Sequence, residues 1–316
     1  MKRVFLLMTL VWALTACQGT QKEVRVLYWN VQDGMWADQG NDYVNFVAFV
    51  KSVDPDICVW CEAESRYRTD VHEKMTEREE FYLPYNWDIL ARRYGHEYAV
   101  LAGKRDGFPQ VITAKFPIRI VKRLVGEGDI QIVHGAGLAT IPVGGDSLHI
   151  VTVHTYPFAY EYGLKDPELQ KESKKRGDGD RFRAKEVQYI VEHTLGEKPG
   201  NEKGLWMMLG DFNAIARSDN GHYGRPEDDT AFLTHDYVAT ETVYQDAVGL
   251  KYPGEFQSTT LSGRRIDFVY CTPSLYEKIR DIRVLREGYP KNHRDSIAKP
   301  LCRPSDHLPI LIDFAF

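Results

Sequence analysis

Short apolar runs recur along the chain, and each one carries a polar residue at or near its end. The runs are rich in β-branched and aromatic residues, a composition typical of strands in a sheet. They lie at residues 27–30, 57–62, 150–154, 205–213, 264–270 and 305–316. Strands that end in this way present their last side chains at one edge of a sheet, so the pattern predicts a single shared site.

Helical spacing appears between some of these runs. Residues 41–52 and 182–195 each place apolar side chains three or four positions apart, which predicts helices that pack on a sheet. The order of strand, helix and strand at the start is that of a βαβ unit. Residues 155–181 read as a long irregular stretch, with aromatic residues first and basic residues later. The alternation of elements predicts the α/β class.

Two segments carry the most specific chemistry. In Gly210-Asp211-Phe212-Asn213-Ala214, the residues Asp211 and Asn213 are two positions apart. Side chains of an extended backbone alternate with period two, so both can converge on one bound group. In Ser305-Asp306-His307-Leu308-Pro309, the adjacent Asp306 and His307 offer groups for metal binding and proton transfer.

The polar residues follow one another in a recognisable order. The series is Asn30, Glu62, His154, Asp211 with Asn213, Asp267, and Asp306 with His307. This order resembles the endonuclease/exonuclease/phosphatase superfamily, of the deoxyribonuclease I-like type, and the resemblance extends over nearly all of the chain. It implies a four-layer αββα sandwich, in which two packed mixed β-sheets are flanked by helices. Because the first and last residues of the series must meet in one site, we expect residues 24–316 to form a single domain.

The resemblance also implies a metal-dependent phosphoesterase in which water attacks the P–O bond directly, without a covalent enzyme intermediate. Glu62 and Asp306 are hard oxygen ligands suited to Mg²⁺ or Mn²⁺. Asn30 is expected to orient Glu62 or to contact the metal through water. The set lacks the clustered histidines and cysteines that favour zinc.

The proton-transfer roles fall on the later motifs. Asp211 is expected to align or deprotonate the attacking water, and Asn213 to hold a phosphoryl oxygen through its amide. His307, hydrogen-bonded to Asp267, would act as a base or as a donor to the transition state. Whether Asp211 or His307 activates the water stays open.

The remaining candidates concern the substrate. His154 resembles the family histidine that donates to the phosphate or to the leaving group, and Glu97 is the expected counterpart of the glutamate that supports it. Arg264 and Arg265 directly precede Asp267, where they could grip a substrate. Tyr156 begins an aromatic segment that could be packing or a rim that stacks against the substrate.

The N-terminus is typical of a targeting sequence. Two basic residues precede an apolar stretch at residues 4–16 that is too short to cross a bilayer as a helix, so residues 1–16 are predicted to be a signal peptide. Residues 14–17 resemble the lipobox of bacterial lipoproteins, which implies a lipid on Cys17 and a short tether over residues 17–23. Gln18 then favours the outer membrane of a Gram-negative cell. Ordinary secretion, with Cys17 incidental, is the alternative.

The net charge and the cysteines limit the substrates and the disulfides that we expect. The chain has 45 acidic and 40 basic residues, a net charge of −5, and no evident basic stripe. This favours an extracytoplasmic small or lipid-derived phosphate ester over DNA or RNA as the substrate, although a nuclease and a non-catalytic binding lipoprotein remain alternatives. We expect a monomer. Cys58 and Cys61 are predicted to be buried strand thiols, while a pair between Cys271 and Cys302 stays open.

Overall fold

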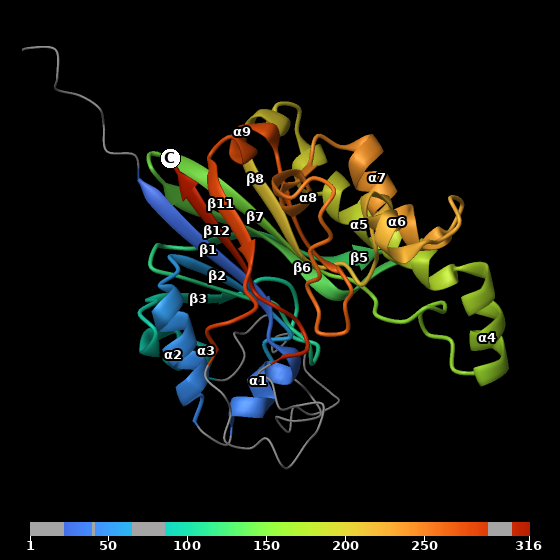
Figure 1. The fold of residues 1–316 in the computed structure, drawn as a ribbon, viewed down its shortest axis with the longest axis horizontal. Helices are drawn as coiled ribbons and strands as arrows, with labels where there is room; N and C mark the ends of the chain where they lie inside the picture. Colours follow the sequence, from blue (N-terminus) through green and yellow to red (C-terminus); the bar gives the residue numbers. More distant parts are fainter. Residues whose placement is uncertain (1–21, 40–41, 65–85, 290–304) are drawn as a thin grey trace, which may run out of the picture.

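A computed structural model describes residues 22–39, 42–64, 86–289 and 305–316. Its strands form two six-stranded sheets, with the order β11-β12-β1-β2-β4-β3 in sheet A and β5-β6-β7-β8-β10-β9 in sheet B (Figure 1). Sheet A consists of β1 (Glu23–Asn30), β2 (Ile57–Cys61), β3 (Tyr98–Leu101), β4 (Val111–Ala114), β11 (Ile279–Val284) and β12 (Ile310–Ala315). Sheet B consists of β5 (Arg119–Glu127), β6 (Ile130–Val143), β7 (Asp146–His154), β8 (Leu205–Asp211), β9 (Gln245–Asp246) and β10 (Asp267–Cys271).

The inner faces of the two sheets form the central core. Strand β1 shows how alternation divides its residues, because Val26 and Tyr28 join the cluster that also contains Leu209 of β8 in sheet B. Leu27 and Trp29 face the other side and join the cluster under the helices of sheet A. Both faces of β1 are therefore buried over its second half, which explains the continuous apolar run at residues 26–29.

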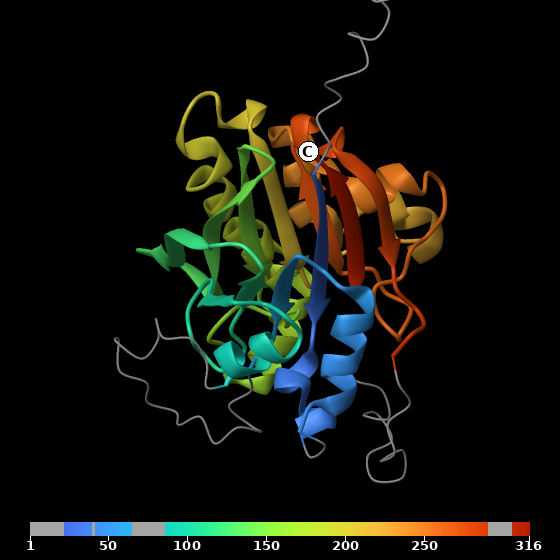
Figure 2. The ribbon, with the colours of Figure 1, turned by 90° about the vertical axis from the view of Figure 1, so that its left-hand side faces the viewer.

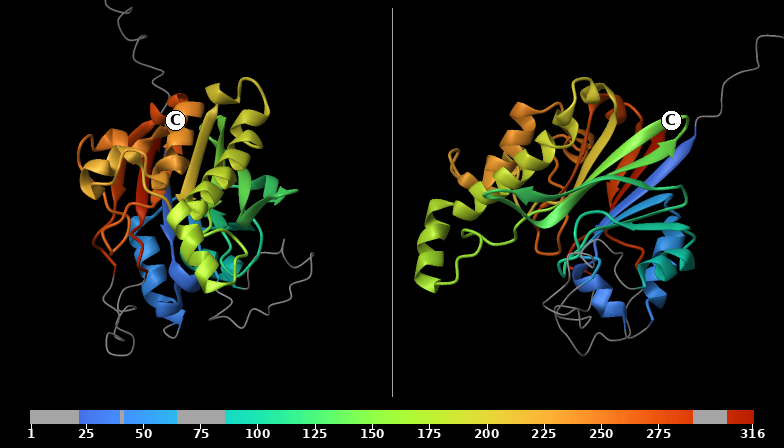
Figure 3. Two further views of the ribbon diagram at one scale, coloured as in Figure 1. Left: turned by 90° about the vertical axis from the view of Figure 1, so that its right-hand side faces the viewer. Right: turned by 180° about the vertical axis from the view of Figure 1, so that it is seen from behind.

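Helices cover the outer face of each sheet. On sheet A lie α2 (Val44–Val53) and α3 (Trp87–Arg93), whose aromatic and aliphatic residues share a cluster with Trp29 and Trp60 (Figure 2). On sheet B lie α5 (Asp178–Glu192) and α7 (Leu233–Glu241), which pack over the outer side of the strands (Figure 3). The four-layer αββα sandwich expected from the resemblance is confirmed.

Smaller elements complete the described chain. The short helices are α1 (Gln32–Gln39), α4 (Pro167–Arg176), α6 (Asn220–Tyr223), α8 (Ala247–Lys251) and α9 (Pro273–Tyr276). Single 3₁₀ turns occur at Leu195–Glu197, Asn201–Lys203, Arg217–Asp219 and Thr230–Phe232. In the ranges that the structure covers, no helix is both long and apolar enough to cross a membrane.

The expectation that residues 155–181 are irregular is wrong for their second half, which forms α4. Asp166 caps this helix by accepting hydrogen bonds from the backbone of Glu168 and Leu169, Pro167 occupies its first turn, and Gly177 ends it with a φ of 70°. These are ordinary start and stop signals. The helix was missed because it buries almost no apolar side chain; it lies away from the sheets (Figures 1 and 3).

The cysteine predictions are confirmed in part. Cys58, Cys61 and Cys271 are buried free thiols in strands of the two sheets. Cys302, Cys17 and the predicted signal peptide lie outside the described residues.

Candidate active site

The polar residues of the sequence series meet at one end of the two sheets. In sheet A, β1 and β2 run parallel with Asn30 opposite Cys61, so Asn30 and Glu62 leave neighbouring strands together. In sheet B, Asp211 is opposite His154 on one side and Asp267 on the other. Two packed sheets therefore bring carboxylates and imidazoles from distant sequence positions to a common edge.

Asn30 links the two sheets. Its Nδ2 donates to Glu62 Oε1 at 3.1 Å and to Asp211 Oδ2 at 3.2 Å, which holds two carboxylates close together. Glu62 also accepts from the backbone of Asp33 at 3.2 Å. Burial raises the pKa of Glu62, and the charge of His307 opposes this shift. Glu62 has a φ of 53°, a strained backbone conformation that is often found at functional sites.

His307 lies between two carboxylates. Its Nδ1 is 2.8 Å from Asp267 Oδ2, and its Nε2 is 3.8 Å from Asp211 Oδ2. Burial alone would lower the pKa of His307, but Asp267 and Asp211 raise it above the usual range. Burial raises the pKa of Asp211, and His307 opposes that shift. Asp211 and His307 therefore influence each other's protonation, which suits the pair to acid–base chemistry.

Tyr28 supports this arrangement and was missed by the sequence analysis. Its hydroxyl donates to Asp267 Oδ1 at 2.7 Å, so both oxygens of Asp267 are engaged. Burial raises the pKa of Tyr28 well above its usual value, which keeps the hydroxyl protonated as a donor. A signal was present, because Tyr28 and Asn30 are two positions apart on one strand and so share a face.

Asn213 is fixed by the chain around it. Its backbone N–H donates to Asp211 Oδ1 at 2.8 Å, and its Nδ2 donates to the carbonyl oxygen of Thr155 at 3.0 Å. Its φ of 47° turns the backbone away from the line of β8, which ends at Asp211. Asn213 is thus held beside Asp211 by a left-handed turn and these hydrogen bonds, and not by the extended, period-two backbone that the sequence analysis assumed.

The segment that carries Asp306 and His307 is anchored to β1. Ser305 Oγ donates to the carbonyl oxygen of Asn30 at 2.7 Å, and Trp29 Nε1 donates to the carbonyl oxygen of His307 at 3.0 Å. The Asp306 side chain stays 55 % exposed, with one oxygen 3.9 Å from His307 Nε2. Asp306 is therefore the accessible carboxylate at the mouth of the site.

His154 is placed in the site, but the expected support by Glu97 is wrong. Glu97 is exposed and directly precedes Tyr98, the first residue of β3. Through the pairing of both strands with Ala114 of β4, Tyr98 is level with Ile57, the first residue of β2. That is the end of the sheet opposite to Glu62. Nδ1 of His154 has no hydrogen-bond partner among the described residues.

A different imidazole accompanies His154. The ring of His134 stacks on it with centroids 4.2 Å apart, and His134 Nδ1 is 2.6 Å from Asp106 Oδ2. The sequence analysis identified neither residue, because both lie outside the strand-end motifs. Burial and the neighbouring His134 lower the pKa of His154 well below its usual value, and its Nε2 is 3.9 Å from Glu62 Oε1.

The donor set fits a divalent metal. Ligand atoms of Glu62, His154 and Asp211 all lie within 4.8 Å of one another, and Asp306 adds an accessible carboxylate. Hard cations such as Mg²⁺ and Mn²⁺ take oxygen ligands, so the carboxylates suit the ion, and the imidazole of His154 is left for other contacts.

These residues line a cavity of about 670 Å³. All of the series except Asn30 and Asp267 line it, and its walls also contain Lys104, Asp106, Phe108, Val133, His134, Tyr156, Pro157, Phe158, Tyr162, Thr260, Ser262, Arg264 and Ile266. Tyr156 is buried in the wall, whereas Phe158 and Tyr162 are about half exposed at the rim. Arg264 is an exposed side chain at this cavity.

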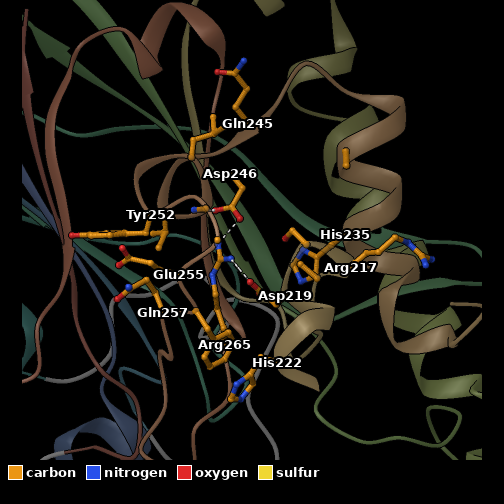
Figure 4. Close-up of a pocket in the computed structure, with 18 of the residues that line it drawn as sticks. Arg217, Asp219, His222, His235, Gln245, Asp246, Tyr252, Glu255, Gln257 and Arg265 are labelled. Carbon is orange, nitrogen blue, oxygen red and sulfur yellow. Dashed lines mark hydrogen bonds and ion pairs between the residues drawn. The ribbon is translucent and has the colours of Figure 1, made fainter. Parts of the chain in front are cut away.

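Arg265 does not reach this cavity, so its expected contact with substrate is wrong. It is 2 % exposed and donates to Asp219 at 3.1 Å and to Asp246 (Figure 4). These residues belong to a second cavity of about 600 Å³, here called the Arg265 cavity, which is also lined by His222 and His235. Successive residues of an extended segment point to opposite sides, which explains why Arg264 and Arg265 separate.

The comparisons agree with this geometry. A family model for the Endonuclease/Exonuclease/phosphatase family matches residues 27–307. The chain belongs to this family. It is therefore a hydrolase of phosphoester bonds, and the matched residues contain the whole series from Asn30 to His307. No curated protein matches the chain.

Solved structures show the same fold at low identity. An AP endonuclease from Archaeoglobus fulgidus is 16 % identical, covers 92 % of this chain and 99 % of its own, and gives a TM-score of 0.58. The human nocturnin catalytic domain with bound sulfate is 14 % identical, with 93 % of each chain covered and a TM-score of 0.59. A Neisseria 3' phosphatase, NExo, bound to product DNA hairpin, is 16 % identical, covers 93 % of this chain and 100 % of its own, and gives a TM-score of 0.57.

Proposed function

We propose that this protein is a Mg²⁺- or Mn²⁺-dependent phosphoesterase of the cell envelope that hydrolyses a small phosphate ester by direct attack of water. The observation that carries the proposal is the meeting of Asp211, His307 and Glu62 within one cavity. Glu62 and Asp306, with Asn30, would hold the ion, which neutralises charge on the phosphoryl oxygens when bound. Asp211 and His307 align the water and take its proton, and Asn213 donates its amide to a phosphoryl oxygen.

The walls of the cavity support a compact substrate. Lys104 and Arg264 are its only lysine and arginine side chains in the part of the chain that the structure describes, and neither forms an ion pair there. Aromatic rings occupy the wall around Tyr156 and the rim at Phe158. One phosphate with an apolar or aromatic group matches this lining, whereas a nucleic-acid backbone requires many cationic contacts.

The direction of β1 bears on lipid-derived substrates. Glu23 begins this strand beside Ala315, and Asn30 ends it at the active site. Eight residues of strand span roughly 26 Å. A lipid on Cys17 would therefore hold the end of the domain opposite to the cavity, which favours a diffusing ester over a headgroup in the same membrane leaflet.

The test is turnover by the full chain in detergent, with either metal, of bis-p-nitrophenyl phosphate, inositol phosphates, sphingomyelin, plasmid DNA and RNA. We expect cleavage of a small ester that is lost with EDTA and with His307→Ala. Preferential cleavage of DNA or RNA would replace the proposal with a nuclease, a class to which the names of some structural neighbours belong. Absence of turnover throughout would favour a binding protein.

Attachment to the membrane is tested separately. In a Gram-negative host, the full chain should incorporate labelled palmitate and sediment with the outer membrane. Cys17→Ser should remove both properties without changing turnover. Sedimentation with the membrane that survives Cys17→Ser would overturn the lipoprotein assignment.

A further inference from the structure

His134 is a second imidazole in the active-site cavity that the roles described so far leave without a task. It lies on β6, beside β7 with His154, and the two rings stack at 4.2 Å with an angle of 19° between their planes. Nδ1 of His134 faces Asp106, so Nε2 is the nitrogen left for the cavity.

The partner carboxylate is held firmly. One oxygen of Asp106 accepts from the backbone N–H of Phe108 at 2.9 Å, and the other contacts His134. Arg105, next to it, makes two hydrogen bonds of 2.7 and 2.8 Å to Glu64. An imidazole fixed by an oriented carboxylate has a defined tautomer and direction, as proton transfer requires.

The backbone of His134 is fixed as well. Gln110 Nε2 donates to the carbonyl oxygen of Gly135 at 2.8 Å, and the backbone N–H of Val133 donates to Glu186 Oε1 at 2.9 Å. His134 is thus bounded on both sides by hydrogen bonds from other elements, and only its ring edge faces the cavity.

The two stacked rings differ in the carboxylates that they contact. Burial alone would lower the pKa of His134, but Asp106, with smaller contributions from Glu186 and Glu62, raises it above the usual value. The carboxylate nearest to His154 is that of Glu62, whose Oε1 is 3.9 Å from Nε2 of His154, and Nδ1 of His154 has no hydrogen-bond partner among the described residues. His134 is therefore the imidazole of this pair that a hydrogen-bonded carboxylate orients, as a proton donor requires.

The order of strands gives the two rings different places around the phosphorus. Across sheet B, β10, β8, β7 and β6 are successive neighbours, and they present Asp267, Asp211, His154 and His134 respectively. Asp211, with His307, lies on the side that activates water. In phosphoryl transfer the attacking and leaving oxygens are roughly in line, on opposite sides of the phosphorus. His134 lies two strands away from Asp211 in this order, toward the side that the leaving oxygen would occupy.

We propose that His134 is the general acid of this enzyme and protonates the leaving oxygen through Nε2, with Asp106 as its positioning residue. This inference rests on the proposed function. The water oxygen forms the new bond to phosphorus and releases a proton to Asp211 or His307. The bond from phosphorus to the leaving oxygen breaks, its electron pair stays on that oxygen, and the proton of His134 completes the product hydroxyl. Solvent returns a proton to His134, while His154 donates to a non-bridging oxygen.

The test is the dependence of kcat/KM on the leaving group, measured with the full chain and aryl esters of methyl phosphate from p-nitrophenyl to unsubstituted phenyl. A good leaving group needs little protonation, so His134→Gln should cost less than ~10-fold with the nitrophenyl ester. With the phenyl ester the loss should reach ~10²-fold or more. Asp106→Asn should also make kcat/KM depend more steeply on the leaving group, but by less than His134→Gln does.

The matched control is His149→Gln. His149 is on β7, also stacks on a ring, that of Trp206 at 4.3 Å, and lies toward the other end of the strand from His154. It should leave the dependence unchanged. The proposal would be overturned if His134→Gln and Asp106→Asn lost the same activity with every aryl ester, or lost none. A role in folding or in binding does not distinguish leaving groups. Absence of metal-dependent turnover by the wild type would instead contradict the proposed function.

Should His134→Gln unfold, Asp106→Asn retains the imidazole and still reports on its orientation. Thermal unfolding of each variant separates the two cases. An unchanged leaving-group dependence in folded Asp106→Asn would contradict the positioning role of Asp106.

Discussion

The active-site cavity and the Arg265 cavity are built from the same residue types, yet only one of them is arranged for catalysis. In the Arg265 cavity the charges satisfy one another, because Arg265 is bonded to both Asp219 and Asp246 (Figure 4). His235 there has hydrogen bonds at both ring nitrogens, to Tyr270 and to the backbone of Ala214. Arg265 Nε has no hydrogen-bond partner among the described residues, but neither ring nitrogen of His235 is left open for proton transfer.

The active-site cavity leaves its groups incompletely paired. His307 has one nitrogen bonded to Asp267, and the other is 3.8 Å from Asp211, beyond hydrogen-bonding distance. Asp306 is more than half exposed. The difference indicates that a reactive site is recognised by imidazoles and carboxylates that are held in place but keep an unpaired atom facing the cavity. The presence of Asp, His and Arg alone does not identify it.

The largest expected effect is the difference in kcat between variants of His307 and of His235. His307→Ala should lower kcat by ~10³-fold, within the range for loss of a general acid or base, while the protein stays folded. His235→Gln should leave kcat per folded molecule within about threefold, because that side chain contacts no substrate. Initial rates on the best ester, normalised by circular dichroism, provide the comparison; similar losses for both would remove the distinction.

The two neighbouring arginines should show opposite kinds of loss. Arg265→Met leaves two carboxylates buried without their partner, so we expect about 3–5 kcal/mol less stability in urea unfolding. Activity per folded molecule should be retained. A catalytic loss without a stability loss would place Arg265 with the substrate after all.

Acid should weaken the Arg265 cavity through His235. Burial lowers the pKa of His235 to about 3, so below the usual value of 6.5 the unfolded chain binds a proton that the folded chain excludes. Stability is then lost as the pH falls, by up to about 1.4 kcal/mol per pH unit. Between about pH 7 and about pH 5, the stability difference between wild type and His235→Gln should shrink by about 2 kcal/mol. A constant difference in urea titrations would contradict the neutral state of His235.

The smallest effect concerns Arg264. Because its side chain is exposed at the cavity, Arg264→Ala should raise KM by about tenfold or less, with stability changed by less than about 0.5 kcal/mol. Steady-state kinetics with one small ester and one DNA substrate would show whether this side chain favours either. An unchanged KM for both would remove Arg264 from the substrate contacts.

Much of the site could be predicted from sequence because its residues occupy strand ends. Asp211 ends β8 opposite Asp267 at the start of β10, and His307 contacts Asp267 through its imidazole. Asn213 lies beside Asp211 for a reason that period-two spacing did not supply, because its backbone leaves the strand in a left-handed turn. The same reasoning failed for Glu97, where a plausible glutamate in a strand-like segment lies at the wrong end of its strand. Direction along a sheet depends on connections that local spacing does not encode.

The sequence by itself determined the series from Asn30 to His307 and the α/β sandwich, because alternation and helical periodicity are local consequences of side-chain burial. Only the tertiary structure decided that Arg265 turns away from Arg264, that Tyr28 holds Asp267, and that His134 stacks on His154 beside Asp106. These pairings join residues that are distant in sequence or lie outside motifs. They exist only after the two sheets have packed and fixed which side chains share one small volume.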